Sequence, residues 1–432
     1  MARKKINRRK FLKDSSAATV ALLGFPYIIP SKVLGKNGQN APSNRVAMGA
    51  IGVGQRGAGV LRNFMNQKDA QILAVCDVKT DVRKKVQSEI NEYYNSKDCA
   101  EYNDYKELLA RSDIDAVLIA SPDHWHVLHA VDTASANKDM YLEKPIGLSI
   151  EQAQVLRNTI KKHGRVFQLG TQQRSNSNFR FACELVLNGR IGRVHTIKVG
   201  APGGILSENY PTMPVPQGLD YQRWLGPAPN VPYTQKRVTN FWWFHISDYA
   251  LGFVAGWGIH HVDIAQWGNG TEFTGPVEVE GKGIFPKDGL CDCAINWDVN
   301  LKYANGVTVS FTDNSKNKQG VVFEGTDGWV YVRRGFIETQ PASLLTERIG
   351  HNEIHLPVSN HHQQNLLDCI KSRETTVSPI ESAVCSEIIC HLSDIAMRLG
   401  RKLKWDPQKE KFLNDDQANR MLTRSMRSPW HL

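Results

Sequence analysis

The sequence lacks the cysteine and apolar patterns that mark several classes of protein. Its eight cysteines include no Cys-x-x-Cys pair, and Cys291 and Cys293 stand too close together for a metal knuckle, so buried free thiols are expected. The apolar run over residues 17–29 is interrupted by Gly24 and Pro26, which leaves it short of the ~20 residues that a membrane-spanning helix needs. The chain also has no internal repeat and no low-complexity segment. These absences argue against a metal-knuckle, membrane-anchored or repeat protein.

The chain has little net positive charge beyond its first 40 residues. The net charge of the chain is +10, and nine Lys/Arg against the single acid Asp14 place +8 of it within residues 1–40. The rest of the chain therefore carries only +2. The basic balance belongs to the N-terminal segment, so it gives no reason to expect nucleic acid or an anionic membrane as a partner.

The N-terminal segment reads as an export signal. Residues 7–13, Asn-Arg-Arg-Lys-Phe-Leu-Lys, form a twin-arginine signature ahead of the small and apolar run, and such signals serve proteins that are exported already folded. No cysteine precedes Cys76, so the junction offers no lipid-anchor site. We expect residues 1–40 to be signal peptide and linker, the twin-arginine machinery to be a partner, and the protein to be periplasmic. A basic N-terminal arm kept in the cytoplasm is the alternative.

A glycine-rich turn is the most informative motif of the chain. Gly52, Gly54 and Gly57 form Gly-x-Gly-x-x-Gly directly after a strand-like run and before a helix-compatible stretch. The glycines serve a tight turn, close approach of the backbone to a pyrophosphate, and close packing of helix on strand. The N–H groups near Gln55 and Arg56 then point at an anion. This spacing predicts a dinucleotide site.

An acidic residue in the right place strengthens that prediction. The next apolar run, residues 71–76, ends in Asp77, twenty residues past Gly57. A carboxylate there accepts bonds from the ribose 2′- and 3′-hydroxyls and repels a 2′-phosphate, which favours NAD over NADP. The alternative is a glycine-rich turn in some other α/β protein.

The hydrophobic pattern divides the mature chain in two. Over residues 44–165 short apolar strands, at 72–76, 116–120 and 140–142, alternate with helical stretches, which predicts a parallel sheet with helices on both faces. Residues 166–432 show period-two runs, which predict a large open and mostly antiparallel sheet, followed by helices over 361–399. The expected strands of that sheet are 194–199, 277–283, 294–303, 307–312 and 321–332. The aromatic-rich residues 201–256 have no clear period and predict a lid or an interface.

Three clusters outside the glycine turn carry candidate chemistry. Residues 121–126, Ser-Pro-Asp-His-Trp-His, follow a strand at the carboxyl edge of the sheet, where ligands bind. Glu143-Lys144-Pro145 follows the next strand, and a lysine fixed there faces the nicotinamide, with the proline aiming it and free to adopt the cis form. An exposed lysine at a strand end is the alternative. The third cluster holds His260 and Asp263, three residues apart and so on one face of a helix, where a histidine suits a proton relay.

A metal site is an alternative for the histidine-rich segment. His245, His260, His261 and Asp263 are ligand types that suit zinc or iron. The spacing does not fix their mutual geometry, and a hydrogen-bonded core histidine or a substrate contact explains them more simply. We expect no metal.

With these motifs in this order, the chain resembles the Gfo/Idh/MocA family of oxidoreductases. The resemblance runs from about Arg45 to the C-terminal tail and includes residues 170–174, 400–407 and 427–430. It implies a Rossmann domain joined to an open-sheet α/β domain, a homo-oligomer (dimer or tetramer) formed through that sheet, and NAD(P)-linked chemistry on a sugar or polyol. By motif, Lys144 is the implied proton-relay lysine and His260 the substrate-facing histidine. The expected cofactor contacts are Gly52, Gly54, Gln55, Arg56, Gly57, Asp77, Ser121, Pro122, His126, Glu143, Lys144 and Gln172.

One position departs from the family pattern. Where active members carry Asp-x-Gly-x-His, this chain has Gly256-Trp-Gly-Ile-His260, so the aspartate that commonly works with the lysine and the histidine is a glycine. Either Lys144 and His260 suffice, or Asp248 or His245 replaces the aspartate, or the chemistry is altered or lost.

Three functions from different classes fit these residues. The first is an exported oxidoreductase that acts on a sugar, polyol or sugar derivative with a tightly held cofactor, a hydroxyl proton leaving through Lys144 or His260. The second is a glycosidase that uses NAD transiently: it oxidises a ring carbon, eliminates the aglycone, adds water and reduces the carbon again. The third is a non-catalytic sugar-binding relative, suggested by Gly256.

Overall fold

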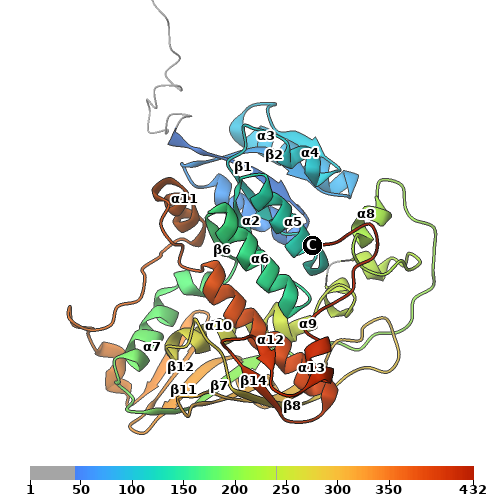
Figure 1. Cartoon of the computed structure of the whole chain (residues 1–432). Helices are drawn as coiled ribbons and strands as arrows, with labels where there is room; N and C mark the ends of the chain where they lie inside the picture. Colours follow the sequence, from blue (N-terminus) through green and yellow to red (C-terminus); the bar gives the residue numbers. More distant parts are fainter. Residues whose placement is uncertain (1–43, 240) are drawn as a thin grey trace, which may run out of the picture. The chain divides into compact units, whose positions relative to one another are not determined.

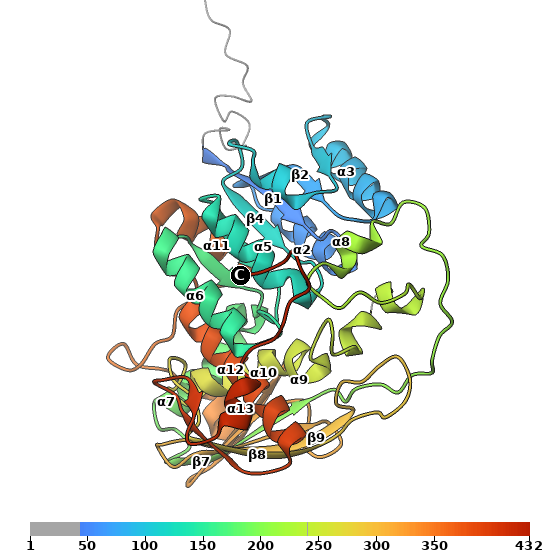
Figure 2. The same cartoon turned by 45° about the vertical axis from the view of Figure 1, so that its right-hand side comes forward.

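Two β-sheets carry the structure, a computed structural model that describes residues 44–239 and 241–432. Figures 1 and 2 show the sheet of the N-terminal half at the top and the C-terminal sheet at the bottom, with helices between them. Residues Val46–Leu432 form one compact unit, and a continuous apolar core runs through it from one sheet to the other. The predicted signal segment, residues 1–40, lies outside the described residues.

The first sheet is the predicted parallel one. Its six strands lie in the order β3-β2-β1-β4-β5-β6, and every neighbouring pair is parallel. The strands are β1 (Val46–Ile51), β2 (Ala70–Cys76), β3 (Ala100–Tyr102), β4 (Ala116–Ile119), β5 (Asp139–Leu142) and β6 (Phe167–Leu169). The helices that alternate with them are α2 (Gln55–Met65), α3 (Thr80–Tyr94), α4 (Tyr105–Leu109), α5 (Asp123–Ser135) and α6 (Ile150–His163).

Helices cover both faces of this sheet, as the pattern predicted. One apolar cluster joins α2 and α3 to the sheet, and the main core joins α4, α5 and α6 to its other face. Strands β4 and β5 are buried along their whole length, because a strand covered on both faces has no solvated side. The carboxyl ends of β1, β2, β4 and β5 therefore meet at one edge, and the candidate residues follow those ends.

The second sheet is open and mixed, with antiparallel pairs predominating. Its nine strands lie in the order β13-β12-β11-β7-β10-β9-β8-β14-β15, and β7 and β10 form its parallel pair. The strands are β7 (Val194–Ala201), β8 (Glu278–Ile284), β9 (Asn296–Lys302), β10 (Thr308–Asp313), β11 (Gly320–Gly325), β12 (Trp329–Arg333), β13 (Phe336–Gln340), β14 (Leu403–Asp406) and β15 (Lys411–Phe412).

One expectation about this half needs correction. The run 321–332, predicted as one strand, is the hairpin of β11 and β12, and β13, which continues the meander, was not predicted. The helices expected over 361–399 are α11 and α12: the C-cap residue of α11, Arg373, lies in the left-handed region (φ +63°), and α12 starts after Pro379. The helices of this half are α7 (Ser177–Leu187), α9 (Gly252–Gly256), α10 (Gly258–Gly268), α11 (His362–Ser372), α12 (Ile380–Leu399) and α13 (Asp416–Arg420).

The aromatic segment 201–256 packs as a small core of its own. Tyr221 and Trp224, in α8 (Tyr221–Leu225), are buried with Tyr233 and Tyr249 against one another. Turns of 3-10 helix, η4 (Lys236–Val238) and η5 (Trp243–His245), continue the segment. Further 3-10 turns occur at η3 (Gln172–Ser175) and η6 (Ala342–Thr346). Among the described residues no helix is long and apolar enough to cross a membrane.

Candidate active site

The glycine turn has the geometry that its sequence predicts. Gly52, at the end of β1, has φ +79°, and a Cβ atom there would lie 2.4 Å from the backbone nitrogen of Ser121. A Cβ on Gly57 would lie 1.9 Å from the carbonyl oxygen of Gly52. A Cβ on Gly54 would meet nothing within 4 Å. The first and last glycines thus let β1, β4 and α2 approach closely, while Gly54 leaves open space in front of the backbone.

The start of α2 is suited to an anion. Gly54 is its N-cap residue and provides no side-chain hydrogen bond to the first turn, and that turn contains no acidic residue. The partial positive charge of a helix N-terminus therefore faces the open space at Gly54. A pyrophosphate group fits this position by charge and by shape.

Asp77 lies where a ribose-binding carboxylate belongs. It follows β2, and its two oxygens accept hydrogen bonds from the backbone N–H of Val53 (3.0 Å) and of Lys79 (2.9 Å). Burial raises the pKa of Asp77, and these two N–H donors and the charges of Lys79 and Arg83 oppose the rise. The carboxylate is held rigidly at the edge of the cavity described next, with lone pairs left to accept bonds from hydroxyl groups.

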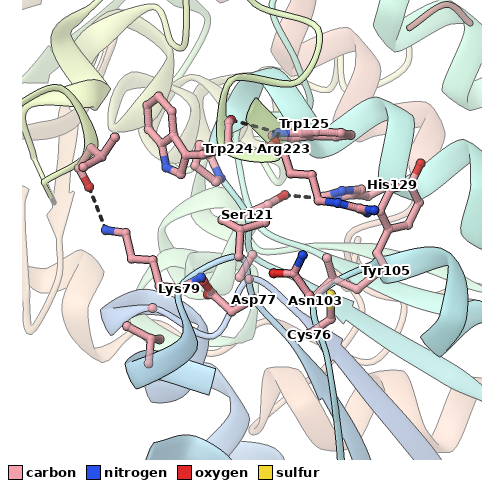
Figure 3. A pocket seen from close by; sticks show the side chains of 18 of the residues that line it. Cys76, Asp77, Lys79, Asn103, Tyr105, Ser121, Trp125, His129, Arg223 and Trp224 are labelled. Atoms are coloured by element: carbon pink, nitrogen blue, oxygen red, sulfur yellow. Dashed lines mark hydrogen bonds between the residues drawn. The ribbon is translucent and has the colours of Figure 1, made fainter. Parts of the chain in front are cut away.

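A cavity of about 250 Å³ extends from the glycine turn past Asp77. Figure 3 shows Asp77, Asn103 and Ser121 pointing into it, with Trp224 on the opposite side. The walls come from the ends of β1, β2 and β4, whereas Trp224, Trp243 and Trp430 belong to the aromatic segment and to the C-terminal tail. The cavity is elongated, apolar on its walls and bounded by a carboxylate and a helix N-terminus, which are the features of a dinucleotide site.

Segments distant in sequence form the roof of this cavity. Arg223 pairs with Asp104 at 2.7 Å, and Asn103 donates a hydrogen bond to Asp220 at 3.0 Å. The ring of Trp430 stands edge-on to that of Trp125, with the centroids 4.7 Å apart. Figures 1 and 2 show the C-terminus returning to α5. The tail is fastened there because Arg427 donates a hydrogen bond to the carbonyl of Gly226 at 2.9 Å.

A second cavity, of about 410 Å³, adjoins the first. The two share the residues at the start of α2 and at the end of β4, and these residues would hold the nicotinamide end of a bound dinucleotide. The shared lining residues are Gln55, Arg56, Ala120, Ser121 and Trp243. The other lining residues are Gly59, Asp123, His126, Glu143, Lys144, Phe241, Phe244, Phe253, Gly256, Trp257, His260 and Arg334.

Lys144 lies in this second cavity, directly after β5. Its Nζ donates a hydrogen bond to the carbonyl oxygen of Gly256 at 2.5 Å and lies 5.8 Å from the centroid of the Phe244 ring. The Lys144–Pro145 peptide is cis. Burial lowers the pKa of Lys144, against the attraction of Glu143 and Asp123. A buried lysine with a lowered pKa can exist as the neutral amine and accept a proton.

Asp123 is the carboxylate beside this lysine. It is the first residue of α5, it is 3% exposed, and its Oδ2 is buried without a hydrogen-bond partner among the described residues. Burial raises the pKa of Asp123 well above its usual range, and the charge of Lys144 opposes the rise. The charges of Asp123 and Lys144 thus each affect the pKa of the other.

Phe244 explains the departure at Gly256. A Cβ atom on Gly256 would lie 1.7 Å from Cζ of the Phe244 ring. The aromatic segment therefore occupies the space that the aspartate of the family pattern needs. The carboxylates that line this cavity are Asp123, from the start of α5, and Glu143, which follows β5.

His260 also lines the second cavity, on the first turn of α10. It is 2% exposed, and its Nδ1 has no hydrogen-bond partner among the described residues. Burial, followed by the positive charges of Lys144 and Arg334, holds the pKa of His260 well below its usual range. The ring is therefore neutral at physiological pH and can donate or accept a single hydrogen bond.

The remaining predicted contacts split into two groups. Ser121 lines both cavities, and His126 bridges the carbonyls of Ser121 and Pro145 at 2.7 and 2.6 Å, so it fixes the ends of β4 and β5 relative to each other. Glu143 accepts a hydrogen bond from Arg56 at 2.8 Å. Gln172 donates to Glu143 at 3.2 Å but lies outside the lining of either cavity, so its contact with the site runs through that carboxylate.

The two residues suggested as substitutes for the missing aspartate lie elsewhere. His245 is buried against Phe253, with ring centroids 4.9 Å apart, and burial lowers the pKa of His245 to about 4. Burial raises the pKa of Asp248. Neither residue is part of the lining of the second cavity, so the structure does not bring them to Lys144.

Two of the four residues of the alternative metal site are engaged with other partners. Asp263 forms a buried ion pair with Arg174 at 2.7 Å, and His261 bonds the carbonyl of Gly200 at 2.8 Å. Within residues 44–239 and 241–432 no cluster of three or more His, Cys, Asp or Glu side chains has the geometry to hold a metal ion. Asp263, predicted on one helix face with His260, is thus a structural residue.

Sequence reasoning did not assign a role to four of these residues. The place of Asp123 in the site could have been predicted from the sequence, because it begins a helix at the carboxyl edge of a parallel sheet. Phe244 and Trp430 were visible as aromatics without a partner. Arg334 carried no local signal, because the turn that contains it reaches the cavity through the packing of the second sheet.

Comparison with known proteins agrees with this geometry. The family model described as "Oxidoreductase family, NAD-binding Rossmann fold" matches residues 46–171, and "Oxidoreductase family, C-terminal alpha/beta domain", of the same family, matches residues 203–432. The uncharacterized oxidoreductase YrbE of Bacillus subtilis is 26% identical over 63% of this chain and 68% of its own length. The alpha-N-acetylgalactosaminidase of Shewanella oneidensis is 32% identical over 36% of this chain, and the match spans 37% of that relative's length.

Solved structures share the fold. The WlbA dehydrogenase of Bordetella pertussis, in complex with NADH and UDP-GlcNAcA, matches 84% of this chain and 99% of its own with a TM-score of 0.61 and 15% identity. The myo-inositol 2-dehydrogenase of Lactobacillus plantarum matches 83% and 99% with a TM-score of 0.58 and 16% identity. The chain has a dinucleotide cavity at its glycine turn and matches the models of both domains of one family. It therefore belongs to the Gfo/Idh/MocA family of NAD(P)-dependent oxidoreductases.

Proposed function

We propose that the protein oxidises a carbinol carbon of a sugar, polyol or sugar derivative with NAD that it holds tightly. The observation that carries the proposal is the shared wall between the two cavities. Lys144, Asp123 and His260 line one cavity, and it adjoins the dinucleotide cavity at Ser121 and Arg56. A carbinol placed beside Lys144 thus lies within reach of a nicotinamide ring that enters through this wall.

In this reaction the bound dinucleotide supplies the hydride acceptor. The neutral amine of Lys144 removes the hydroxyl proton, and the Gly256 carbonyl, 2.5 Å from Nζ, orients it. Asp123 stabilises the ammonium group that results, because it lies beside a buried cation in a low-dielectric site. His260, neutral by burial, bonds the reacting hydroxyl or its neighbour.

The aromatic lining supports a carbohydrate as substrate. Phe241, Phe244, Phe253 and Trp257 line the second cavity together with several unpartnered polar groups. Apolar ring faces and a few polar groups together match a sugar, which presents C–H faces and hydroxyl edges.

NAD is the expected cofactor rather than NADP. The Asp77 carboxylate, bonded to two backbone N–H groups, favours a ribose with free hydroxyls and repels a 2′-phosphate. Lys79, which lines the same cavity, is engaged with the carbonyl of Val238 at 2.9 Å.

A glycosidase with transiently used NAD is the second candidate. The roof formed by Trp224, Trp243 and Trp430 favours it, because it would keep the cofactor in place. A cofactor that does not leave must return to its starting oxidation state on the protein. The glycosidase cycle achieves this by itself, whereas a net oxidation needs a second substrate. The relative named alpha-N-acetylgalactosaminidase, 32% identical over 171 residues, also points to it. In such a reaction Lys144 would serve both the oxidation and the final reduction.

One experiment separates these candidates. Mass spectrometry identifies the nucleotide released on denaturation, and the loaded protein is then offered free sugars and nitrophenyl glycosides. A net oxidoreductase needs a second substrate to turn over repeatedly, whereas a glycosidase releases nitrophenol with no acceptor present. A loaded protein that binds sugars but changes neither them nor the absorbance of its nicotinamide would contradict both.

We further propose that the protein is exported folded to the periplasm and forms a homo-oligomer through its second sheet. The twin-arginine signature at residues 7–13 supports the first part. For the second, α7, α10 and α12 pack against the sheet, and buried and more exposed side chains alternate along β8 and β9, which leaves a more exposed face that a second copy would cover. Fractionation of cells and sedimentation of the purified protein test the two parts independently.

A further inference from the structure

The second cavity contains one cation that the mechanism above does not use. Arg334 lies in the two-residue turn between β12 and β13, which Gly335 closes in the left-handed region (φ +72°). This turn brings its guanidinium over the ring of Trp257, 4.9 Å from the centroid. The same ring stands 5.9 Å from that of His260, so Arg334 and the proposed substrate-facing histidine share one aromatic platform.

Among the cations of the cavity, Arg334 has no counter-charge of its own. Arg56 is paired with Glu143 at 2.8 Å, and Lys144 lies beside Asp123. Arg334 forms no ion pair and no hydrogen bond with any residue that the structure describes. Arg334 is exposed, so its guanidinium is accessible to a ligand. Partial burial and the positive charge of Arg56 lower the pKa of Arg334, and the negative charge of Glu143 opposes them.

The missing counter-charge does not come from the dinucleotide. Arg334 lines the second cavity and is not part of the lining of the first, whose anion position is the start of α2. A ligand group that neutralises Arg334 therefore lies on the substrate side of the site. Trp257 provides a second polar group on the substrate side. Its Nε1 donor is buried and has no hydrogen-bond partner among the described residues, so a ligand oxygen could accept a bond from it.

We infer that Arg334 and Trp257 form an anion subsite, and that the substrate is an acidic sugar whose carboxylate binds there. A planar guanidinium binds a carboxylate through two parallel hydrogen bonds, and the tryptophan ring holds the guanidinium in place. The sugar ring then spans from Arg334 to Lys144 and His260, with the acidic group away from the reacting carbon. The inference rests on the proposed function for the sugar nature of the ligand, and it narrows the substrate class to hexuronic acids and their glycosides.

The test measures binding and does not depend on turnover. Calorimetric titration of the loaded protein compares glucuronate, galacturonate and mannuronate with glucose, galactose and mannose, each also as the methyl glycoside. We expect at least one uronate to bind at least about tenfold more tightly than its neutral partner, and added salt to weaken that preference. Arg334→Gln should lower uronate affinity about 10- to 100-fold and leave neutral-sugar affinity unchanged. Arg334→Lys should restore it in part, because it keeps the charge but not the planar fork.

Arg333 provides the matched control. It is the neighbouring residue of the same hairpin, its guanidinium stacks on Phe336 at 5.0 Å, and it lines neither cavity. Arg333→Gln should leave all affinities unchanged. The inference is overturned if every uronate binds no more tightly than its neutral partner, if no sugar binds, or if Arg333→Gln and Arg334→Gln cause equal losses. A protein that binds uronates through Arg334 but leaves its nicotinamide unchanged would refute the proposed function and uphold this inference.

Discussion

The two adjoining cavities differ in how their polar groups are satisfied. Four residues of the second cavity, Asp123, Glu143, Trp257 and His260, each have a buried nitrogen or oxygen without a hydrogen-bond partner among the described residues. None of the described residues that line the first cavity has such an atom in its side chain. Asp77, for example, is held there by two backbone N–H groups.

This difference suits the first cavity to binding the cofactor and the second to the reaction. Buried polar groups in folded proteins are almost always hydrogen-bonded, so a cluster of unpaired ones marks a place where a ligand completes the bonding. In the first cavity the buried polar side chains already have partners, and contacts of Arg223 and Arg427 hold its roof in place. The second is left incomplete, and its unpaired groups surround Lys144. Substitutions in the two cavities should therefore have separable effects.

The largest expected effect is that of Lys144→Ala. It should lower turnover about 10²–10⁴-fold, the usual scale of general acid–base catalysis, with the cofactor still bound. Lys79→Ala is the matched control in the first cavity, where it removes a bond to the Val238 carbonyl and should weaken cofactor retention without slowing the loaded enzyme. Single-turnover absorbance of the nicotinamide, with the nucleotide content measured on the same samples, checks both. Loss of cofactor in Lys144→Ala at unchanged turnover would reverse the assignment of the cavities.

Asp77→Ala should have the next largest effect. It removes the acceptor for the ribose hydroxyls and the repulsion of a 2′-phosphate together, so NAD affinity should fall about 10- to 100-fold and the preference over NADP should narrow. Titration of the nucleotide-free protein with both cofactors measures the two changes. Asp98→Ala, an exposed acid of the same half, controls for loss of charge. An unchanged ratio of the two affinities would count against the role of Asp77.

Gly256→Asp tests the space that Phe244 occupies. A Cβ at Gly256 meets that ring at 1.7 Å, so the substitution should destabilise the fold by about 1–3 kcal/mol, the usual cost of overpacking. Adding Phe244→Ala should recover part of this loss, and thermal unfolding of the two single variants and the double variant measures the coupling. Gly59→Asp, where a Cβ meets nothing within 4 Å, is the control for the substitution itself. Additive losses in the double variant would mean that the two positions do not compete for space.

Asp123→Asn should have the smallest and most specific effect. The Asp123 carboxylate favours the protonated form of Lys144, so removing its charge lowers the pKa of the lysine further. Because the neutral amine is the active form, the rise of the rate with pH should move to lower pH. The pH–rate profiles of the loaded wild type and variant measure the shift. A shift to higher pH, or no shift, would show that the Asp123 carboxylate does not raise the pKa of Lys144.

Local sequence determined the part of the first cavity at the ends of β1 and β2, but not its roof, and much less of the second cavity. The turn at Gly52, the start of α2 and the position of Asp77 depend on neighbours within one strand–helix–strand unit, so the spacing of a few residues predicts them. The order of the parallel strands also predicted that Lys144 follows β5 at the carboxyl edge. The twin-arginine segment lies outside the described residues, and its role stays a prediction.

The remaining features depend on contacts that sequence spacing does not encode. Phe244 fills the space beside Gly256, Asp123 reaches the second cavity from α5, and Arg334 reaches it from the turn of a hairpin in the second sheet. Long-range packing, not local propensity, decides such positions. The hairpin of β11 and β12 is different, because Gly325-Thr-Asp-Gly328 between its strands is a local turn signal from which it could have been predicted.

The central claim is that the first cavity holds its dinucleotide permanently while chemistry occurs in the second. The most direct measurement is the nucleotide content of protein purified from its own compartment and dialysed extensively, read by mass spectrometry after denaturation. We predict near-stoichiometric NAD(H) in the wild type and a marked loss in Trp430→Ala, which removes the edge-on contact with Trp125 at the roof. Wild-type protein that contains no nucleotide, and gains no thermal stability from added NAD, would contradict the claim.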